Sequence, residues 1–321
     1  MEYNMRIYDM QLGDNFSGYY VINNIQLRSA RNGKNMLLSV LSDSEDSINA
    51  NMFDYNGSMT AADSGRVVFV QGEITEYGGA LQVSLKQLRP ADEHDEGKYK
   101  LQNIVPTAPI DPELALQDVK DMIASLPDED YRRVAETMLD RHYEAFRNIP
   151  AGKHMHHWQL GGLLMHTANM MRTADFLSDL YYYVLDRSLL LTGTMLHDFA
   201  KEEEFVFSGI GLVADYSVPG DLLGHLYMGA RNVHDICREL GIPEEKSMLL
   251  QHLILSHHGE PEFGACVKPQ CAEAELLSML DKLDSRMEIY AEACEKTPLG
   301  SFSQKIPAIE KAIYHHYKAE G

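Results

Sequence analysis

Side chains that can bind metal ions recur inside apolar, helix-like segments in the second half of the chain. They are His166 in GGLLMHT, His197 and Asp198 after LLLTGTML, His225 in DLLGHLYMG, His257 and His258 at the end of LILSHHG, and Asp281 in ELLSMLDKLDSRM. From one member to the next the chain advances by 23 to 32 residues, which is about one helix plus a loop. A helical bundle would therefore direct all of them to one interior spot.

Imidazole and carboxylate groups together suit divalent transition metals such as manganese, iron or cobalt. Seven such ligands are too many for one ion and suit two. Two ions about 3.5–4 Å apart can share a hydroxide that attacks phosphorus while the metals hold the phosphate oxygens. One histidine in an apolar helix is more often a satisfied core residue, so the inference depends on the whole ordered series.

The dipeptide His-Asp is not informative without its context. It occurs at His94-Asp95, His197-Asp198 and His234-Asp235. The first lies in an acidic connector, where we expect it to be solvated, and the third lies within a helix that offers no matching partners. The second ends an apolar helix, where two buried polar groups require partners. Lys201 follows it by about one helical turn.

The chain changes character near residue 100. Before that point apolar and polar residues alternate, as in 48–52 and 81–85, which is the period of half-buried strands. Asn32-Gly33 and Gly78-Gly79 are hairpin signals. We predict five strands, at about 17–29, 35–42, 47–54, 66–75 and 80–88. Five short antiparallel strands suit a small barrel, for which the OB-fold is a good candidate and a β-sandwich the alternative.

A connector that is rich in proline and acidic residues follows at 90–110, and the pattern then becomes helical. Asp111 is the predicted cap of the first helix, with Pro112 in its first turn. The predicted helices are 112–125, 129–147, 160–183, 187–199, 221–240, 244–257, 271–292 and 303–318. The fold class is therefore multidomain, an all-β barrel followed by an all-α domain.

Composition limits what the chain can bind. It has 321 residues, of which 45% are hydrophobic, and a formal net charge of -20. This charge argues against loose binding to a phosphate backbone, so a nucleic-acid enzyme must concentrate positive potential in a groove or at metal ions. The four cysteines have no CxxC spacing, which argues against a zinc ribbon. We find no signal-peptide pattern and no apolar run near the roughly 20 residues of a membrane helix, and expect a cytoplasmic protein.

The ordered series resembles the HD superfamily of metal-dependent phosphohydrolases in its two-metal form. More narrowly, it resembles the YhaM-type 3′–5′ exoribonucleases, which carry an OB domain, a helical connector and an HD domain. The matching segments in 153–287 are KHMHHWQLGGLLMHT, LTGTMLHDFAKEEEF, GDLLGHLYMGA, LILSHHGEPEFGACVKP and AEAELLSMLDKLDSRM. The N-terminal half fits more loosely, through NGKNMLLSVLSD, INANMFDYN and VVFVQGEITEYGGALQVSLKQLRP. The chain has His-His-Gly-Glu-Pro where the cyclic-dinucleotide branch has Gly-Tyr-Pro after its paired histidines.

The resemblance implies a role for each member of the series. One metal would be held by His166, His197, Asp198 and Asp281, with Asp198 bridging, and the other by His225, His257 and His258. Asp198 and Lys201 would be catalytic, with Lys201 contacting the scissile phosphate. Asp284 would orient a histidine, and His157 would contact substrate. The implied cofactors are two divalent ions, manganese first, with cobalt or iron as alternatives.

The implied domains are an OB-fold nucleic-acid-binding domain at 1–98, a connector and helical lead-in at 99–150, and an HD phosphohydrolase domain at 151–321. OB-folds stack bases on aromatic side chains along a basic groove. The candidates here are Phe53, Tyr55, Arg28, Arg31, Lys34 and Lys86. We expect a 3′–5′ exoribonuclease that forms a homo-oligomer and acts on single-stranded RNA, with single-stranded DNA as a second substrate. Two alternatives stay open: an HD hydrolase of a small nucleotide, and a nucleic-acid-binding regulator with a structural metal.

Overall fold

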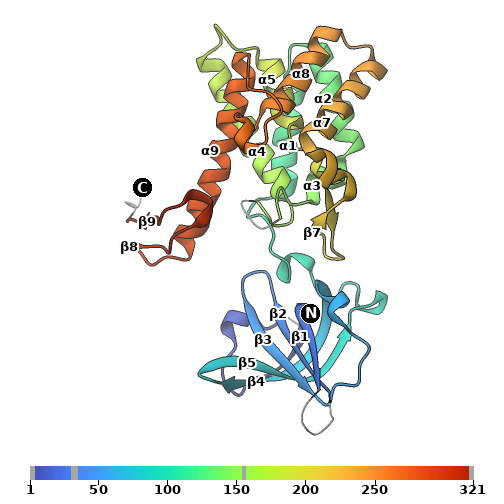
Figure 1. Ribbon diagram of the computed structural model, residues 1–321, viewed down its shortest axis with the longest axis vertical. Helices are drawn as coiled ribbons and strands as arrows, with labels where there is room; N and C mark the ends of the chain where they lie inside the picture. The colour runs from blue at the N-terminus through green and yellow to red at the C-terminus, as the bar shows by residue number, and fades with distance from the viewer. Residues whose placement is uncertain (1–3, 30–34, 154–156, 318–321) are drawn as a thin grey trace. The chain divides into compact units, whose positions relative to one another are not determined.

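The structure is a computed structural model that describes residues 4–29, 35–153 and 157–317. The chain divides into two compact units, one made of 1–107 with 207–214 and the other of 108–206 with 215–321. Strands make up most of the first unit and helices most of the second, as Figure 1 shows in blue to cyan and in green to red. Each unit is described by itself below.

The first unit is a closed five-stranded barrel. Its strands are β1 (Asn15–Ser29), β2 (Asn35–Ser42), β3 (Ser47–Phe53), β4 (Arg66–Tyr77) and β5 (Ala80–Pro90). They pair in the order β1-β2-β3-β5-β4, and β1 closes the barrel on β4. All of the pairs are antiparallel except β3–β5. This is the topology of an OB barrel, so the predicted fold class is confirmed, and each predicted strand end lies within two residues of the observed one.

The period-two alternation explains why these segments form a barrel. In β2 the buried residues are Leu37, Ser39 and Leu41, and the residues between them are only partly buried. The inward side chains of all five strands form one core, which includes Leu37 and Leu41 together with Tyr20 and Val68. Gly78 and Gly79 connect β4 to β5 with positive φ angles of 62° and 83°, a backbone that favours glycine in two-residue hairpins.

The acidic connector after β5 contains a buried ion pair. Asp95 is fully buried and accepts hydrogen bonds from the Tyr19 hydroxyl at 2.7 Å and from the Arg89 guanidinium at 2.5 and 2.9 Å. These bonds from Arg89 hold the pKa of the Asp95 carboxyl far below its usual value. The expectation that His94-Asp95 is solvated is therefore wrong for Asp95, whose cationic partner on β5 compensates the loss of water.

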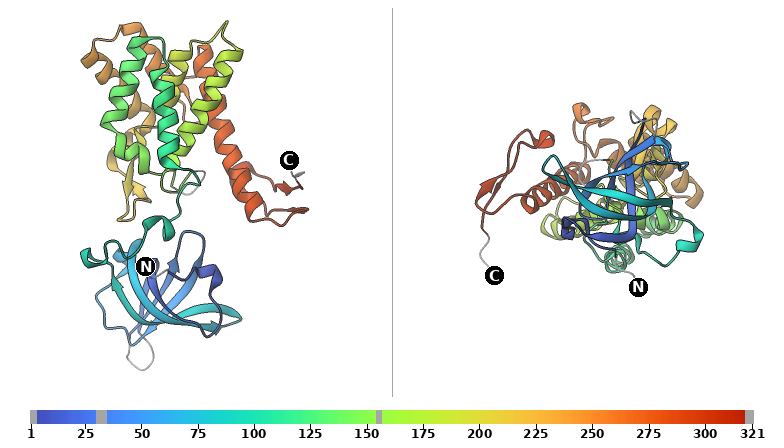
Figure 2. Two further views of the ribbon diagram at one scale, coloured as in Figure 1. Left: turned by 180° about the vertical axis from the view of Figure 1, so that it is seen from behind. Right: turned by 90° about the horizontal axis from the view of Figure 1, so that it is seen from below.

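The second unit is a helical bundle followed by a small hairpin (Figure 2). Its elements are α1 (Pro112–Ala124), α2 (Glu129–Arg141), α3 (Tyr143–Asn148), α4 (Gly162–Leu180), α5 (Arg187–Leu196), α6 (Lys201–Glu204), α7 (Val218–Leu240), α8 (Glu244–Ser256) and α9 (Ala272–Glu295). The short strands β8 (Ser301–Phe302) and β9 (Tyr314–His315) belong to this unit, whereas β6 (Phe205–Phe207) and β7 (Val213–Tyr216) contain residues of both units. Helix α5 is buried from Ser188 to Leu196 because α2, α4, α8 and α9 all pack against it.

Two helix predictions differ from the structure. The segment predicted as one helix at 129–147 is divided into α2 and α3 at His142, whose φ and ψ are -111° and 17°. No α-helix forms at 303–318 within the described residues; a short 3-10 helix at Pro307–Ile309, β9 and a bridge between Ile306 and Lys311 occupy this stretch. Pro307 lies inside it, and a proline ring clashes with the preceding turn of a helix. Across the described residues, no helix is long and apolar enough to cross a membrane.

Candidate metal centre

The bundle brings the predicted series together from five helices. The members are His166 in α4, His197 and Asp198 just after α5, His225 in α7, His257 and His258 just after α8, and Asp281 in α9. His197 and His257 are the C-terminal cap residues of α5 and α8, so the central helices deliver them directly to the interior. All seven are buried or partly buried.

Asp198 lies at the middle of the cluster and its two carboxylate oxygens face different imidazoles. Oδ2 is 3.3 Å from Nε2 of His197 and 3.8 Å from Nε2 of His166. Oδ1 is 3.5 Å from Nε2 of His225 and 3.8 Å from Nε2 of His257. One carboxylate therefore connects two groups of imidazoles, as a ligand shared between two ions would.

The imidazoles are oriented by hydrogen bonds on their outer nitrogens. Nδ1 of His197 donates to the carbonyl of Thr194 at 2.6 Å, and Nδ1 of His257 donates to that of Ile254 at 2.8 Å. A carbonyl can only accept, so the proton of each ring is assigned to Nδ1. Nε2 of each ring then carries a lone pair that faces Asp198, which is the arrangement of a metal-ligating histidine.

The donor set fits divalent metal ions on three counts. Within the described residues, Oδ1 of Asp198, Nε2 of His225 and Nδ1 of His258 are buried without a hydrogen-bond partner. The ligand atoms of His225, His257 and His258 lie within 4.8 Å of one another, and so do those of His166, His197 and Asp198. In addition, Nε2 of His166 and Nε2 of His197 are only 3.3 Å apart. A cation between such atoms would satisfy lone pairs that are otherwise buried without compensation.

The charges of the cluster agree with bound cations. Burial lowers the pKa of His166, but the Asp281 and Asp284 carboxylates outweigh burial and raise that pKa to about 9. These carboxylates favour positive charge at His166, which a proton or a metal ion would supply. Burial and the neighbouring imidazoles hold the pKa of His257 well below its usual value, so this ring is neutral and its lone pair is available to a metal ion.

Asp284 lies within hydrogen-bond distance of two histidines, His166 and His157. Its Oδ2 lies 2.7 Å from Nδ1 of His166 and 2.7 Å from Nε2 of His157. His157 is only 1% exposed and offers no surface to substrate. The structure therefore contradicts the substrate contact predicted for His157 and places this ring beside the carboxylate that positions His166.

Glu204 is a further residue of the centre that the sequence did not distinguish. Its Oε1 accepts hydrogen bonds from Nδ1 of His225 at 2.8 Å and from the backbone N–H of His225 at 3.0 Å. The second bond is available because α7 is kinked at Gly224, whose φ and ψ are 70° and 158°. In the sequence Glu204 follows two other glutamates, Glu202 and Glu203, and burial alone separates it from them.

A cavity of about 870 Å³ opens beside the cluster, within the range of small-ligand sites. Asp198, Lys201, His257, His258 and Asp281 line one part of it. The ammonium of Lys201 donates to Oδ2 of Asp198 at 2.6 Å, so this cation lies where the cavity meets the carboxylate. A ligand in the cavity would meet the metal-binding atoms and a lysine together.

The barrel residues predicted to bind a nucleic-acid strand differ in their exposure and in their existing partners. Phe53 on β3 pairs with Met36 on β2, and Met36 pairs with Arg28 on β1, so the three form a row across the barrel. Phe53 is 64% exposed. Lys86 is already engaged with Glu73 at 3.0 Å. The predicted candidates Arg31 and Lys34 lie outside the described residues.

Tyr55 does not belong to that row. It is 4% exposed, and its hydroxyl accepts a hydrogen bond from the Met59 N–H at 2.8 Å. Asp54, at a φ of 57°, interrupts the strand alternation and turns the Tyr55 ring into the core. The base-stacking role predicted for Tyr55 is therefore wrong.

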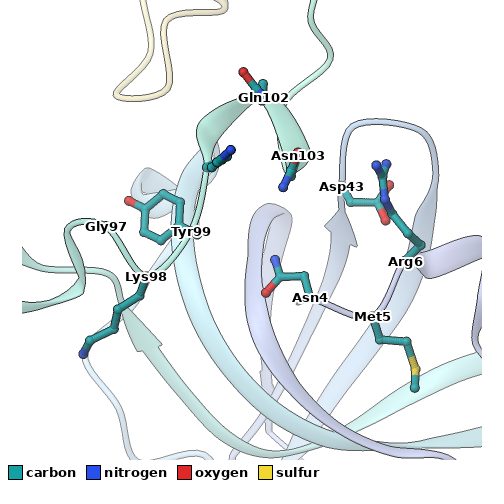
Figure 3. Close-up of a pocket in the computed structure, with 10 residues that line it drawn as sticks. Asn4, Met5, Arg6, Asp43, Gly97, Lys98, Tyr99, Gln102 and Asn103 are labelled. Carbon is teal, nitrogen blue, oxygen red and sulfur yellow. The ribbon is translucent and has the colours of Figure 1, made fainter. Parts of the chain in front are cut away.

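The barrel also has a smaller cavity of about 340 Å³ (Figure 3). Arg6 and Asp43 lie at one side of it and Lys98 and Tyr99 at the other. Arg6 is paired with Glu45 at 2.7 Å and Lys98 with Asp95 at 3.3 Å. The cavity beside the histidines is the stronger candidate for phosphate chemistry, because the candidate metal ligands line it.

The fold and the site together define a class, a metal-dependent phosphohydrolase of the HD type joined to an OB barrel. Residues 163–286 match the model of the HD domain family. The second OB-fold domain of replication protein A from Methanococcus maripaludis is 14% identical, with a TM-score of 0.23 over 28% of this chain and 97% of that one.

The curated relatives narrow the class. A protein of Halalkalibacterium halodurans named 3′-5′ exoribonuclease YhaM is 32% identical, over 95% of this chain and 94% of the relative. The Bacillus subtilis protein with the same name is 31% identical, over 95% of this chain and 96% of the relative. The Bacillus pumilus protein of that name is 33% identical, over 89% and 90%. The chain therefore belongs to the YhaM family of 3′–5′ exoribonucleases.

Proposed function

We propose that this chain hydrolyses the phosphodiester bonds of single-stranded RNA from the 3′ end, with two divalent ions, manganese first among them, and releases 5′-nucleotides. The observation that carries the proposal is the position of Asp198, with one oxygen facing each of two imidazole groups. The direction of digestion and the choice of RNA come from the relatives that are named 3′-5′ exoribonucleases.

Two groups of side chains would hold the ions. His166, His197 and Asp281 would hold one, His225, His257 and His258 the other, and Asp198 would bridge them. Cobalt or iron would suit the same donors. Bound there, the ions supply Lewis-acid activation of water and neutralise charge on the phosphate oxygens.

The reaction is a displacement at phosphorus. The oxygen of a water molecule forms a bond to the phosphorus of the terminal nucleotide, and the bond from phosphorus to the upstream O3′ breaks. O3′ receives a proton, so the shortened strand leaves with a 3′ hydroxyl and the nucleotide leaves as a 5′-monophosphate. Lys201 lines the cavity, and its ammonium would hold a phosphate oxygen where negative charge develops.

The barrel gives the enzyme a surface for the upstream strand. Arg28, Met36 and Phe53 form a row across three strands, in which the exposed Phe53 ring can stack on a base. Stacking and backbone contacts of this kind do not read the 2′ hydroxyl, so we expect single-stranded DNA to bind as well. The homo-oligomer and the cytoplasmic location predicted from the sequence stay predictions.

The test is the substitution Asp198→Asn, which keeps the shape of the side chain and removes its charge. We expect loss of bound Mn²⁺ and of RNA hydrolysis. The matched control is Asp235→Asn, in the exposed His-Asp doublet of α7, which we expect to leave both unchanged. Full activity in the Asp198→Asn protein would overturn the mechanism. A wild-type protein that binds Mn²⁺, leaves RNA intact and hydrolyses mononucleotides would favour the small-nucleotide alternative.

A further inference from the structure

Two cations on α9 line the same large cavity as the histidines. Lys282 and Arg286 lie on α9, four residues apart and therefore on one face of the helix. Among the residues that the structure describes, no carboxylate lies within ion-pair distance of either side chain. Lys268, also in the wall, is by contrast paired with Glu260 at 2.7 Å.

Both side chains are exposed, so each can take up an anionic ligand without breaking an ion pair within the described residues. Like charges four residues apart on a helix destabilise it slightly. An anion bound between Lys282 and Arg286 would remove that repulsion. Asp281, the metal-ligand candidate on α9, immediately precedes Lys282, so the bound anion would lie beside the metal centre.

An aromatic side chain completes the wall. Phe263 is 61% exposed at the cavity, and the Lys282 ammonium lies 5.8 Å from the centre of its ring. Because this phenyl ring is exposed to water, it contributes little hydrophobic stabilisation to the fold. It does offer a flat apolar face to a planar ligand.

The loop that carries Phe263 is fixed rather than loose. The Phe263 N–H donates to the Glu260 carbonyl at 2.9 Å, and the Cys266 N–H donates to the Leu255 carbonyl of α8 at 3.0 Å. Gly264 packs so closely on the metal-ligand candidate His258 that a Cβ at Gly264 would come within 3.3 Å of Nδ1. The backbone that carries Phe263 is therefore held next to the centre.

We propose that Phe263, Lys282 and Arg286 form the subsite for the 3′-terminal nucleotide, with Phe263 stacking on the base and the two cations binding phosphate. The proposal rests on the proposed exonuclease function and adds to it the contacts made to the departing nucleotide. Stacking on a ring accepts every base, which suits an enzyme that removes one nucleotide after another. The two cations add to the local positive potential that a nucleic-acid enzyme needs in a chain with a net charge of -20.

The first test measures binding rather than turnover. Adenosine 5′-monophosphate and ribose 5-phosphate are titrated by calorimetry into the full-length protein in the presence of Mn²⁺. We expect Phe263→Ala to weaken binding of adenosine monophosphate by roughly 5- to 100-fold and to leave ribose 5-phosphate unchanged. We expect Lys282→Gln to weaken both ligands by on the order of 5- to 20-fold, because each carries the phosphate.

Matched controls come from elsewhere in the helical unit. Lys120→Gln removes an exposed ammonium that lies 5.1 Å from the ring of Tyr143, the same kind of contact outside the cavity. Phe176→Ala removes a phenyl ring that is 69% exposed on α4. Neither control should change the affinity for either ligand.

The second test uses two RNA strands that differ only in whether the 3′-terminal nucleotide carries its base. We expect Phe263→Ala to lower kcat/KM for the strand with the base by roughly 5- to 100-fold and to have no effect on the strand without it. Equal effects of Phe263→Ala on both strands, or on both small ligands, would overturn the subsite. If the wild type digests neither strand, the proposed function fails, while the calorimetric titration still decides whether the subsite exists.

Discussion

Glu204 should control how tightly one of the two metal ions is held. It is buried, and its carboxylate accepts two hydrogen bonds from His225, one from the imidazole at 2.8 Å and one from the backbone N–H at 3.0 Å. Glu204→Ala removes the acceptor for both donors. Glu204→Gln keeps an acceptor oxygen of the same reach and removes only the negative charge.

The two variants should differ in size of effect. A buried donor left without a partner costs about 1–3 kcal/mol. Glu204→Ala leaves two such donors, so we expect a total cost of about 2–6 kcal/mol, divided between the free energy of unfolding and that of metal binding. Replacing a charged acceptor by a neutral one costs about 1–2 kcal/mol. We therefore expect Mn²⁺ affinity at the group of His225, His257 and His258 to fall about 10-fold in Glu204→Gln and about 100-fold in Glu204→Ala.

The assay is metal content after dialysis at fixed free Mn²⁺, followed by a Mn²⁺ titration of hydrolysis. We expect about two ions per chain in the wild type and about one in Glu204→Ala, because His166 and His197 do not depend on Glu204. Glu203→Ala is the control, since Glu203 binds Arg231 at the surface at 2.6 Å. Unchanged Mn²⁺ affinity in Glu204→Ala, or an equal loss in Glu203→Ala, would refute the reasoning.

Two further substitutions test the supports of the site and of the barrel. Gly224→Ala places a side chain on a backbone that is essentially restricted to glycine, so we expect a loss of about 1–3 kcal/mol in unfolding free energy and weaker Mn²⁺ binding. The control is Gly241→Ala, at a left-handed helix end, which should lower stability without changing Mn²⁺ binding. Unchanged Mn²⁺ binding in Gly224→Ala would contradict a role of the kink. Asp95→Asn should destabilise the barrel by about 1.5–3 kcal/mol at pH 6 by calorimetry, because it weakens the charge-assisted hydrogen bonds from Arg89. The bonds from Arg89 depress the pKa of Asp95, so the stability it contributes is present above the ordinary carboxyl pKa near 3.9 and is lost as pH falls towards the depressed value. A wild-type advantage that did not shrink below about pH 4 would show that the ion pair is not its source.

The barrel could be predicted closely because its signals are local. Alternation along β2 and the glycine pair before β5 fix strand positions and register without reference to distant residues. The burial of Tyr55 could not be predicted in this way, because Asp54 adopts a positive φ and breaks the alternation. The burial of Asp95 could not be predicted either, because it depends on Tyr19, which is 76 residues away in the sequence.

The metal-binding series could be anticipated because polar residues in apolar helices need partners. The same reasoning did not find Glu204, whose neighbours Glu202 and Glu203 have the same side chain and differ only in burial. It also did not place His157, which packs on Asp284 across 127 residues of sequence. Such contacts are set by how the helices pack, and composition does not reveal packing.

The central claim, a metal-dependent exonuclease that works from the 3′ end, is tested most directly by a degradation time course. A single-stranded RNA labelled at its 5′ end is incubated with the full-length protein and Mn²⁺, and EDTA is added in a parallel reaction. We expect labelled fragments that shorten one nucleotide at a time from the 3′ end, and an intact strand when EDTA is present. Immediate release of a labelled mononucleotide, or shortening that persists in EDTA, would contradict the claim.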